Sequence, residues 1–169
     1  MVATAAVLGA LELEPAGDGR YRAGHAEMGH GVVFGGQLLG QAIVAAAAGH
    51  EGKRPKTVHT VFARGASPDL PIELVVEPIH AGRAFASTTV TAVQGDRTCT
   101  RSLVLLTAEE PDLIRHATPA PGIEAPGDST GDGSWQVRVV GDVDISDPDA
   151  VGPAELDVWS RFDGVDATA

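Results

Sequence analysis

The fold is decided by one stretch of the sequence, GQLLGQAIVAAAA at residues 36–48. In a helix of this sequence, apolar side chains cover nearly every face, and a helix that is apolar all round is buried rather than laid on a surface. Gly36 and Gly40 leave room for a sheet to approach the helix backbone closely. We therefore expect a central helix from Gly36 to Ala48 that other elements cover.

Two shorter elements are expected before this helix. Thr4 is a suitable N-cap for a short helix, which Pro15 and the turn Gly17-Asp18-Gly19 would end. Residues Gly19 to Gly24, with Tyr21 at the centre, can form a first strand.

After the helix the apolar period changes from 3.6 to 2, which predicts strands. Alternation with many Val and Thr residues marks four strands, at residues 57–64, 72–77, 84–94 and 98–107. The last two are joined by the tight turn Gln94-Gly95-Asp96-Arg97. We expect the four strands to pair mostly in sequence order. An antiparallel sheet wrapped around one buried helix is the hotdog architecture, an α+β fold.

Charge and composition divide the chain. Residues 1–106 hold nine acidic and nine basic side chains, whereas residues 107–169 hold fourteen acidic and three basic ones, which accounts for the whole net charge of −11. Proline and glycine dominate residues 108–134, a composition typical of a linker. We predict a hotdog domain at residues 1–107, a linker at 108–134, and at 135–169 the opening strands of a second repeat. Two strands alone cannot bury their apolar faces.

Several function classes are disfavoured by composition. The longest apolar stretch, Leu38 to Ala48, is far shorter than the ~20 residues that span a bilayer. Cys99 is the single cysteine, so an internal disulfide framework is excluded. Nucleic-acid binding needs a clustered basic face, which an acidic chain does not favour. We expect a cytoplasmic protein without a signal peptide.

The motifs resemble the acyl-CoA thioesterase II family. Its helix-start motif is similar to VFGGQLLGQA at residues 33–42, and its strand motif to VHTVFAR at residues 58–64. Residues 155–164, ELDVWSRFDG, resemble the family's entry into a second hotdog repeat. The resemblance covers about residues 20–107 and implies a double-hotdog enzyme that hydrolyses acyl-CoA to free acid and CoA without a metal or other cofactor.

The resemblance also places the family's catalytic Asp, Thr and Gln in the second repeat, so none of these roles passes to a residue of this sequence. It implies that activity needs a second hotdog polypeptide, in a hetero- or homo-oligomer. A split enzyme, a shortened form and an inactive relative remain open. The alternative function is a non-catalytic subunit that binds acyl-CoA or an acyl carrier, or stabilises a hotdog complex. A hotdog dehydratase or hydratase is a third option, although no His and Asp pair opens this helix.

Three residues are weak catalytic candidates. Gly36 at the helix N-terminus lets a thioester carbonyl approach the backbone N–H groups, and Gln37 could hold a water molecule or the thioester oxygen. The alternative is that the glycines merely start a tightly packed helix, which Gln37 caps. His59 matches a family histidine near the acyl-binding region, or is a hydrogen-bonded structural histidine.

Basic residues are candidates for the phosphates of CoA: Lys53, Arg54, Lys56 and Arg64. The alternative is that these side chains only keep the protein soluble. No metal site is expected, because the spacing of His25, Glu27 and His30 fits no common ligand pattern.

Overall fold

The computed structural model describes residues 3–29, 31–111, 114, 116–119, 122, 133–141, 144, 147–152 and 154–164. The chain divides into two compact units. One is Ala6–Leu113, and the other combines Met1–Ala5 with Ile114–Ala169. Each unit is described by itself below.

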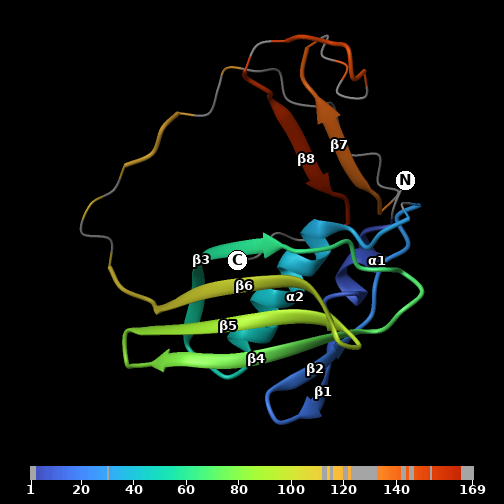
Figure 1. Cartoon of the computed structure of the whole chain (residues 1–169). Helices are drawn as coiled ribbons and strands as arrows, with labels where there is room; N and C mark the ends of the chain where they lie inside the picture. The colour runs from blue at the N-terminus through green and yellow to red at the C-terminus, as the bar shows by residue number, and fades with distance from the viewer. Residues whose placement is uncertain are drawn as a thin grey trace. The chain divides into compact units, whose positions relative to one another are not determined.

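The unit Ala6–Leu113 is a six-stranded antiparallel sheet around one helix, which confirms the predicted hotdog fold (Figure 1). The helix α2 spans Gly35–Ala47, and the short helix α1, Thr4–Gly9, precedes the sheet. The strand order is β1-β2-β4-β5-β6-β3. The strands are β1 Leu13–Gly17, β2 Arg20–Ala23, β3 Lys53–Phe62, β4 Ile72–Ala81, β5 Phe85–Gln94 and β6 Arg97–Ala108.

Strand β1 was not expected from the sequence. The prediction let a helix run up to Pro15, but α1 ends at Gly9 and Pro15 lies within β1, opposite Tyr21 of β2. Proline is tolerated there because β1 is at the edge of the sheet, where a missing N–H breaks no ladder. The turn to β2 contains Asp18, a non-glycine residue at φ 49°.

The four predicted strands pair mostly in sequence order, as expected, with one exception. Strands β4, β5 and β6 do pair in order, but β3 pairs with β6 at the far edge, and β4 pairs with β2. Short turns force neighbours in sequence to pair, whereas residues 63–71 between β3 and β4 are long enough to cross to the other side of the sheet.

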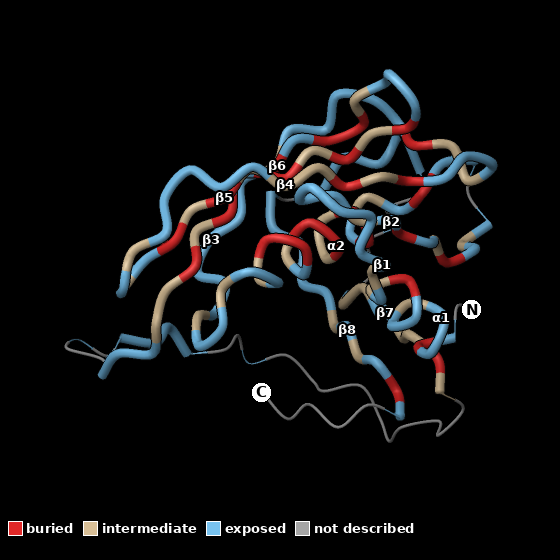
Figure 2. The backbone as a smooth tube through the Cα atoms, turned by 90° about the horizontal axis from the view of Figure 1, so that it is seen from below, coloured by how far each residue is buried: buried red, intermediate tan, exposed pale blue. Residues whose placement is uncertain are grey.

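The core lies between α2 and the concave face of the sheet. Along β5 every second residue is buried, and Ala86, Val90 and Ala92 are at most 1% exposed. The buried face of α2 is formed by Gln37, Leu38, Gln41, Ala42, Ala45 and Ala46 (Figure 2). Small alanines allow the sheet to lie close to the helix backbone. The opposite side of α2 is less covered, and Val44 is 38% exposed.

The second unit contains an antiparallel hairpin of β7, Trp135–Val139, and β8, Val158–Phe162. The rings of Trp135 and Phe162 stack at a centroid distance of 5.4 Å. Register places Val137 opposite Ser160 and on the same face as both rings. Val137 is 56% exposed, so this apolar face is open in the part of the chain that the structure describes. Most of the predicted linker, including residues 123–132, lies outside the described residues.

Within the described ranges, no helix is long and apolar enough to cross a membrane.

Candidate functional site

The N-terminus of α2 is the first candidate site. Phe34 is its N-cap, and the Phe34 carbonyl oxygen accepts the N–H groups of Gln37 at 3.1 Å and Leu38 at 3.3 Å. The N–H groups that precede these two in the first turn have no acceptor within the helix and form its positive end, which can attract a carbonyl oxygen or a phosphate. Phe34 makes no side-chain capping bond.

Aromatic rings lie on both glycines of this helix end. A Cβ atom on Gly36 would lie 2.5 Å from Cε1 of Phe34, and one on Gly35 would lie 3.0 Å from Cε1 of Phe62. The rings pack against the two glycines, so a side chain at either position would require the neighbouring ring to move. The ring of Phe34 lies beside Gly36, in the direction in which a side chain at that position would extend.

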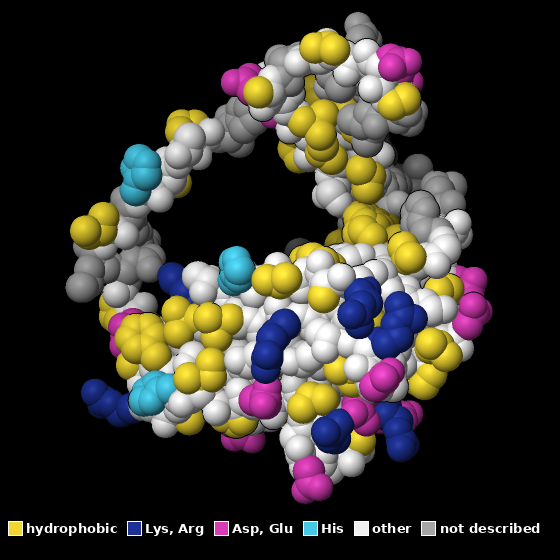
Figure 3. All heavy atoms as spheres, in the orientation of Figure 1, with side chains coloured by type: hydrophobic (Ala, Val, Ile, Leu, Met, Phe, Trp, Pro, Cys, Tyr) yellow, Lys and Arg dark blue, Asp and Glu magenta, His cyan; other side chains and the backbone are white. Residues whose placement is uncertain are grey.

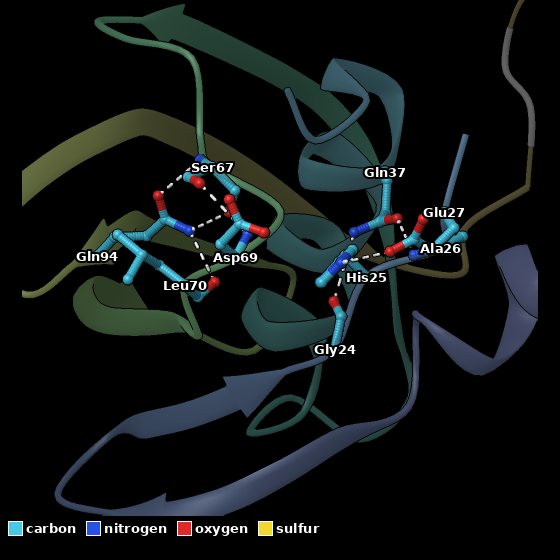
Figure 4. Close-up of polar contacts among 9 residues, drawn as sticks. All are labelled: Gly24, His25, Ala26, Glu27, Gln37, Ser67, Asp69, Leu70 and Gln94. Carbon is cyan, nitrogen blue, oxygen red and sulfur yellow. Dashed lines mark hydrogen bonds and ion pairs between the residues drawn. The ribbon is translucent and has the colours of Figure 1, made fainter. Parts of the chain in front are cut away.

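Gln37, the second catalytic candidate, is only 3% exposed. Its amide oxygen accepts the N–H of Ala26 at 2.8 Å, and its Nε2 donates to the carbonyl oxygen of Gly24 at 3.4 Å (Figure 4). Both ends of the amide thus bind the loop after β2. This geometry favours a positioning role over contact with water or substrate, and it is not the predicted helix cap.

Two further glutamines were not predicted to matter. Gln41, one helical turn after Gln37 and fully buried, donates from Nε2 to the carbonyl oxygens of Ala10 and Gly24 at 2.7 and 2.8 Å. Gln94 binds Ser67 and Leu70, as Figure 4 shows. For Gln41 the sequence did contain a signal for this role. An amide inside an otherwise apolar helix is buried and therefore needs hydrogen-bond partners.

The third catalytic candidate, His59, lies on β3 opposite Leu103 of β6. Its neighbour Val58 is opposite Val104, which is fully buried beneath α2. Successive side chains of a strand point to opposite faces, so His59 lies on the outer face of the sheet, away from the helix. His59 is exposed, and a role in lining the acyl site stays a prediction.

The structure separates the predicted phosphate-binding residues. Lys53, Arg54 and Lys56 lie at the start of β3, whereas Arg64 follows its far end, roughly 30 Å along the strand. Arg83 joins the first group instead. It lies in the turn between β4 and β5, beside residue Ala84, whose carbonyl oxygen accepts the N–H of Ala108 at the end of β6. Lys53 is registered with the same Ala108.

The remaining candidates form no further site. His25 Nε2 and Glu27 Oε1 are 4.0 Å apart, and His30 lies outside the described residues. Among the residues that the structure describes, no three His, Cys, Asp or Glu side chains are arranged to hold a metal ion. Cys99 is a buried free thiol. A cavity of about 550 Å³ beside β1 and β2 is lined by Glu14, Arg22 and Gly24, among others, and holds none of the predicted site residues.

One helix packed on the inner face of an antiparallel sheet, with six strands in the observed order, defines a hotdog protein. A tesB protein of Mycobacterium avium subspecies paratuberculosis has the same fold over 99% of this chain, with a TM-score of 0.81 and 24% identity. A hotdog protein of unknown function from Alicyclobacillus acidocaldarius matches 80% of the chain, with a TM-score of 0.66 and 17% identity.

Within this class, residues 23–107 match the acyl-CoA thioesterase N-terminal domain, and the chain belongs to that family. Acyl-coenzyme A thioesterase 8 of Mus musculus is 32% identical over 124 residues, which cover 72% of this chain. The chain spans only 39% of that relative, 64% of the Mycobacterium protein and 55% of the Alicyclobacillus protein.

Proposed function

We propose that this chain is the first hotdog of an acyl-CoA thioesterase and that a second hotdog polypeptide supplies the catalytic side chains. Water would attack the thioester carbonyl, and free acid and CoA would leave. The observation that carries the proposal is family membership over residues 23–107, which hold the helix α2 and the strands β3 to β6 of the hotdog in this chain.

The closed N-terminus of α2 supports a catalytic site elsewhere. Thioester hydrolysis needs donors for the developing oxyanion and a carboxylate or amide that positions water. The rings of Phe34 and Phe62 lie on the first two helical glycines, and Gln37 is occupied by the loop after β2. A second hotdog, with its own helix N-terminus, would provide the missing groups.

Two surfaces support the need for a second hotdog. Strand β3 is the last strand of the sheet, and an edge strand presents unpaired N–H and C=O groups to another chain. The open apolar face of the β7–β8 hairpin, around Val137 and Phe162, needs a covering element as well.

The basic end of the sheet supports the choice of a CoA ester. Lys53, Arg54, Lys56 and Arg83 gather where β3 starts and β6 ends. Within a chain of net charge −11, such a group attracts phosphates locally. We propose these four residues as the contact to the CoA phosphates, and Arg64 is not part of it.

The test is reconstitution. The purified chain and a polypeptide carrying the second hotdog are assayed alone and together by the release of the CoA thiol from acyl-CoA. We expect activity near background for the chain alone and enzymatic turnover for the mixture. Binding of acyl-CoA without turnover in the mixture would identify the non-catalytic subunit instead. Turnover by the chain alone at an enzymatic rate would contradict the proposed division of roles.

A further inference from the structure

The outer face of the sheet, turned away from α2, is more apolar than a solvated face requires. In the run Leu103-Val104-Leu105-Leu106 of β6, Val104 and Leu106 are fully buried beneath the helix, whereas Leu103 on the outer face is 48% exposed. Strands with one solvated face alternate apolar and polar residues, while continuous apolar runs are typical of strands covered on both faces. This pattern indicates that another surface covers β6 from outside.

The apolar outer patch extends over three strands. Val61 of β3 is 56% exposed and Phe85 of β5 is 49% exposed, and register places both on the same face as Leu103. Figure 3 looks onto this face and shows hydrophobic side chains gathered over its left half. The four strands β4, β5, β6 and β3 measure about 19 Å by 33 Å, roughly 600 Å². A specific interface buries about 800 Å² per partner, with smaller ones known, so an interface that uses the whole outer face, the apolar patch and the polar residues beside it, would be a modest one.

The arrangement of side chains across the patch indicates what covers it. Register aligns Glu77 of β4 with Thr89, then with Leu103, and finally with His59 of β3. In the next row Val75 is aligned with Thr91, Arg101 and, at the other end, Val61. The two ends of each row therefore carry side chains that can pair with each other. They are a carboxylate and an imidazole in the first row, and two valines in the second.

We propose that a second copy of this chain docks on the patch, back to back. A two-fold axis parallel to the strands and between β5 and β6 places β3 of one copy over β4 of the other and keeps each row in line. His59 then faces Glu77 of the second copy, and Val61 faces Val75. Glu77 Oε2 accepts a hydrogen bond from Arg101 at 3.1 Å, which leaves Oε1 to accept the imidazole N–H. Packed sheets lie within about 30° of each other. Both rows lie midway along the strands with their ends about 7 Å to either side of the axis, so such an angle shifts the facing side chains by about one residue along the strand.

This proposal is independent of the proposed function, because the second hotdog would use the edge of β3 and the β7–β8 hairpin rather than the outer face. The full-length double variant His59→Cys/Glu77→Cys tests it. Within one copy these positions are three strand spacings apart, roughly 14 Å, which is beyond the ~7 Å that a disulfide spans. The chain's own Cys99 is 3% exposed. A disulfide between the introduced cysteines must therefore join two copies.

We expect mild oxidation to convert most of the double variant to a covalent dimer on a non-reducing gel. The single variants should stay monomeric on that gel, because the axis does not place position 59 or 77 opposite itself. The matched control is His59→Cys/Glu73→Cys, which moves the cysteine four residues along the same face of β4. Equal cross-linking of this control, or none in the His59/Glu77 pair, would overturn the proposal.

Association in solution gives a second measurement. Sedimentation equilibrium of Leu103→Glu should show at least a tenfold weaker dimer than the unchanged chain. The control Leu70→Glu, at a leucine of similar exposure outside the sheet, should leave the dimer unchanged. Equal dimer strength in both variants would contradict docking on the outer face. Loss of reconstituted turnover with intact cross-linking would count against the proposed function alone.

Discussion

The amide oxygen of Gln37 accepts the backbone N–H of Ala26 at 2.8 Å, which ties the helix inside the sheet to the loop that follows β2. Gln41 binds the same loop one turn later, at Gly24, and also reaches Ala10. Two side chains of one helix thus hold two segments that precede it in the sequence, the loop after β2 and the residue Ala10. These contacts explain why a helix that is otherwise apolar carries two buried amides.

Replacing either glutamine should lower stability. In Gln37→Ala the buried N–H of Ala26 loses its acceptor. In Gln41→Ala the carbonyl oxygen of Ala10 loses its side-chain donor, and that of Gly24 keeps only the longer bond from Gln37. An unsatisfied buried group destabilises by about 1–3 kcal/mol, and we expect a loss of that size in urea unfolding for each variant. Glu27→Ala, in the same loop but exposed, should change little. Equal unfolding midpoints for all three variants would contradict the structural role of the amides.

The turn between β1 and β2 provides a matched pair of glycine substitutions. Gly17 and Gly19 both have positive φ, 82° and 69°, but only at Gly19 would a Cβ meet the backbone, 2.9 Å from the carbonyl oxygen of Val76. Gly17→Ala should therefore lose about 1 kcal/mol through its backbone conformation alone. Gly19→Ala should lose roughly 2–3 kcal/mol, because the strand must also shift. Thermal unfolding checks the order, and a larger loss for Gly17→Ala would be inconsistent with the register of β2 on β4.

The basic end of the sheet should control the KM for acyl-CoA in the reconstituted enzyme. Removing charge from this end, as in Lys53→Ala/Arg54→Ala, should raise KM about tenfold at low salt and less at high salt, because exposed charges are screened. Arg97→Ala, in the turn between β5 and β6, removes a charge at the other end and serves as the control. An equal rise in KM for Arg97→Ala would mean that net charge, rather than this end of the sheet, attracts the substrate.

We expect the β7–β8 hairpin in the second unit to be the surface that the second hotdog contacts. Val137→Glu places a charge on its open apolar face and should weaken reconstitution at least tenfold, measured as the concentration of second polypeptide at half-maximal activity. Gln136 lies on the opposite face, where its Oε1 accepts a hydrogen bond from Arg161 at 2.8 Å. Gln136→Glu keeps an acceptor there and should reconstitute normally. If both variants reconstitute alike, the second hotdog does not use this face.

Local patterns in the sequence determined the type of most elements. The apolar run of residues 36–48 predicted the central helix, because a helix without a polar face must be covered. Alternation predicted β4, β5 and β6 together with their pairing, because short turns leave neighbouring strands no other partner. The family motifs at residues 33–42 and 58–64 agreed with this reading, and the match to residues 23–107 confirmed the family.

Contacts between residues distant in sequence were decided only by the tertiary structure. Pro15 contradicts a strand until β1 is known to lie at an edge, and β3 reaches β6 because a long connection leaves several pairings open. A pattern of period 2 separates the two faces of a strand but does not say which face meets the helix. Only the pairing of β3 with β6 in the tertiary structure showed that His59 lies on the outer face. The roles of Gln37 and Gly36 depend on Ala26 and the ring of Phe34, whose positions follow from the packing of a loop against a helix. Such packing minimises free energy over the whole domain, so no local stretch of sequence specifies it.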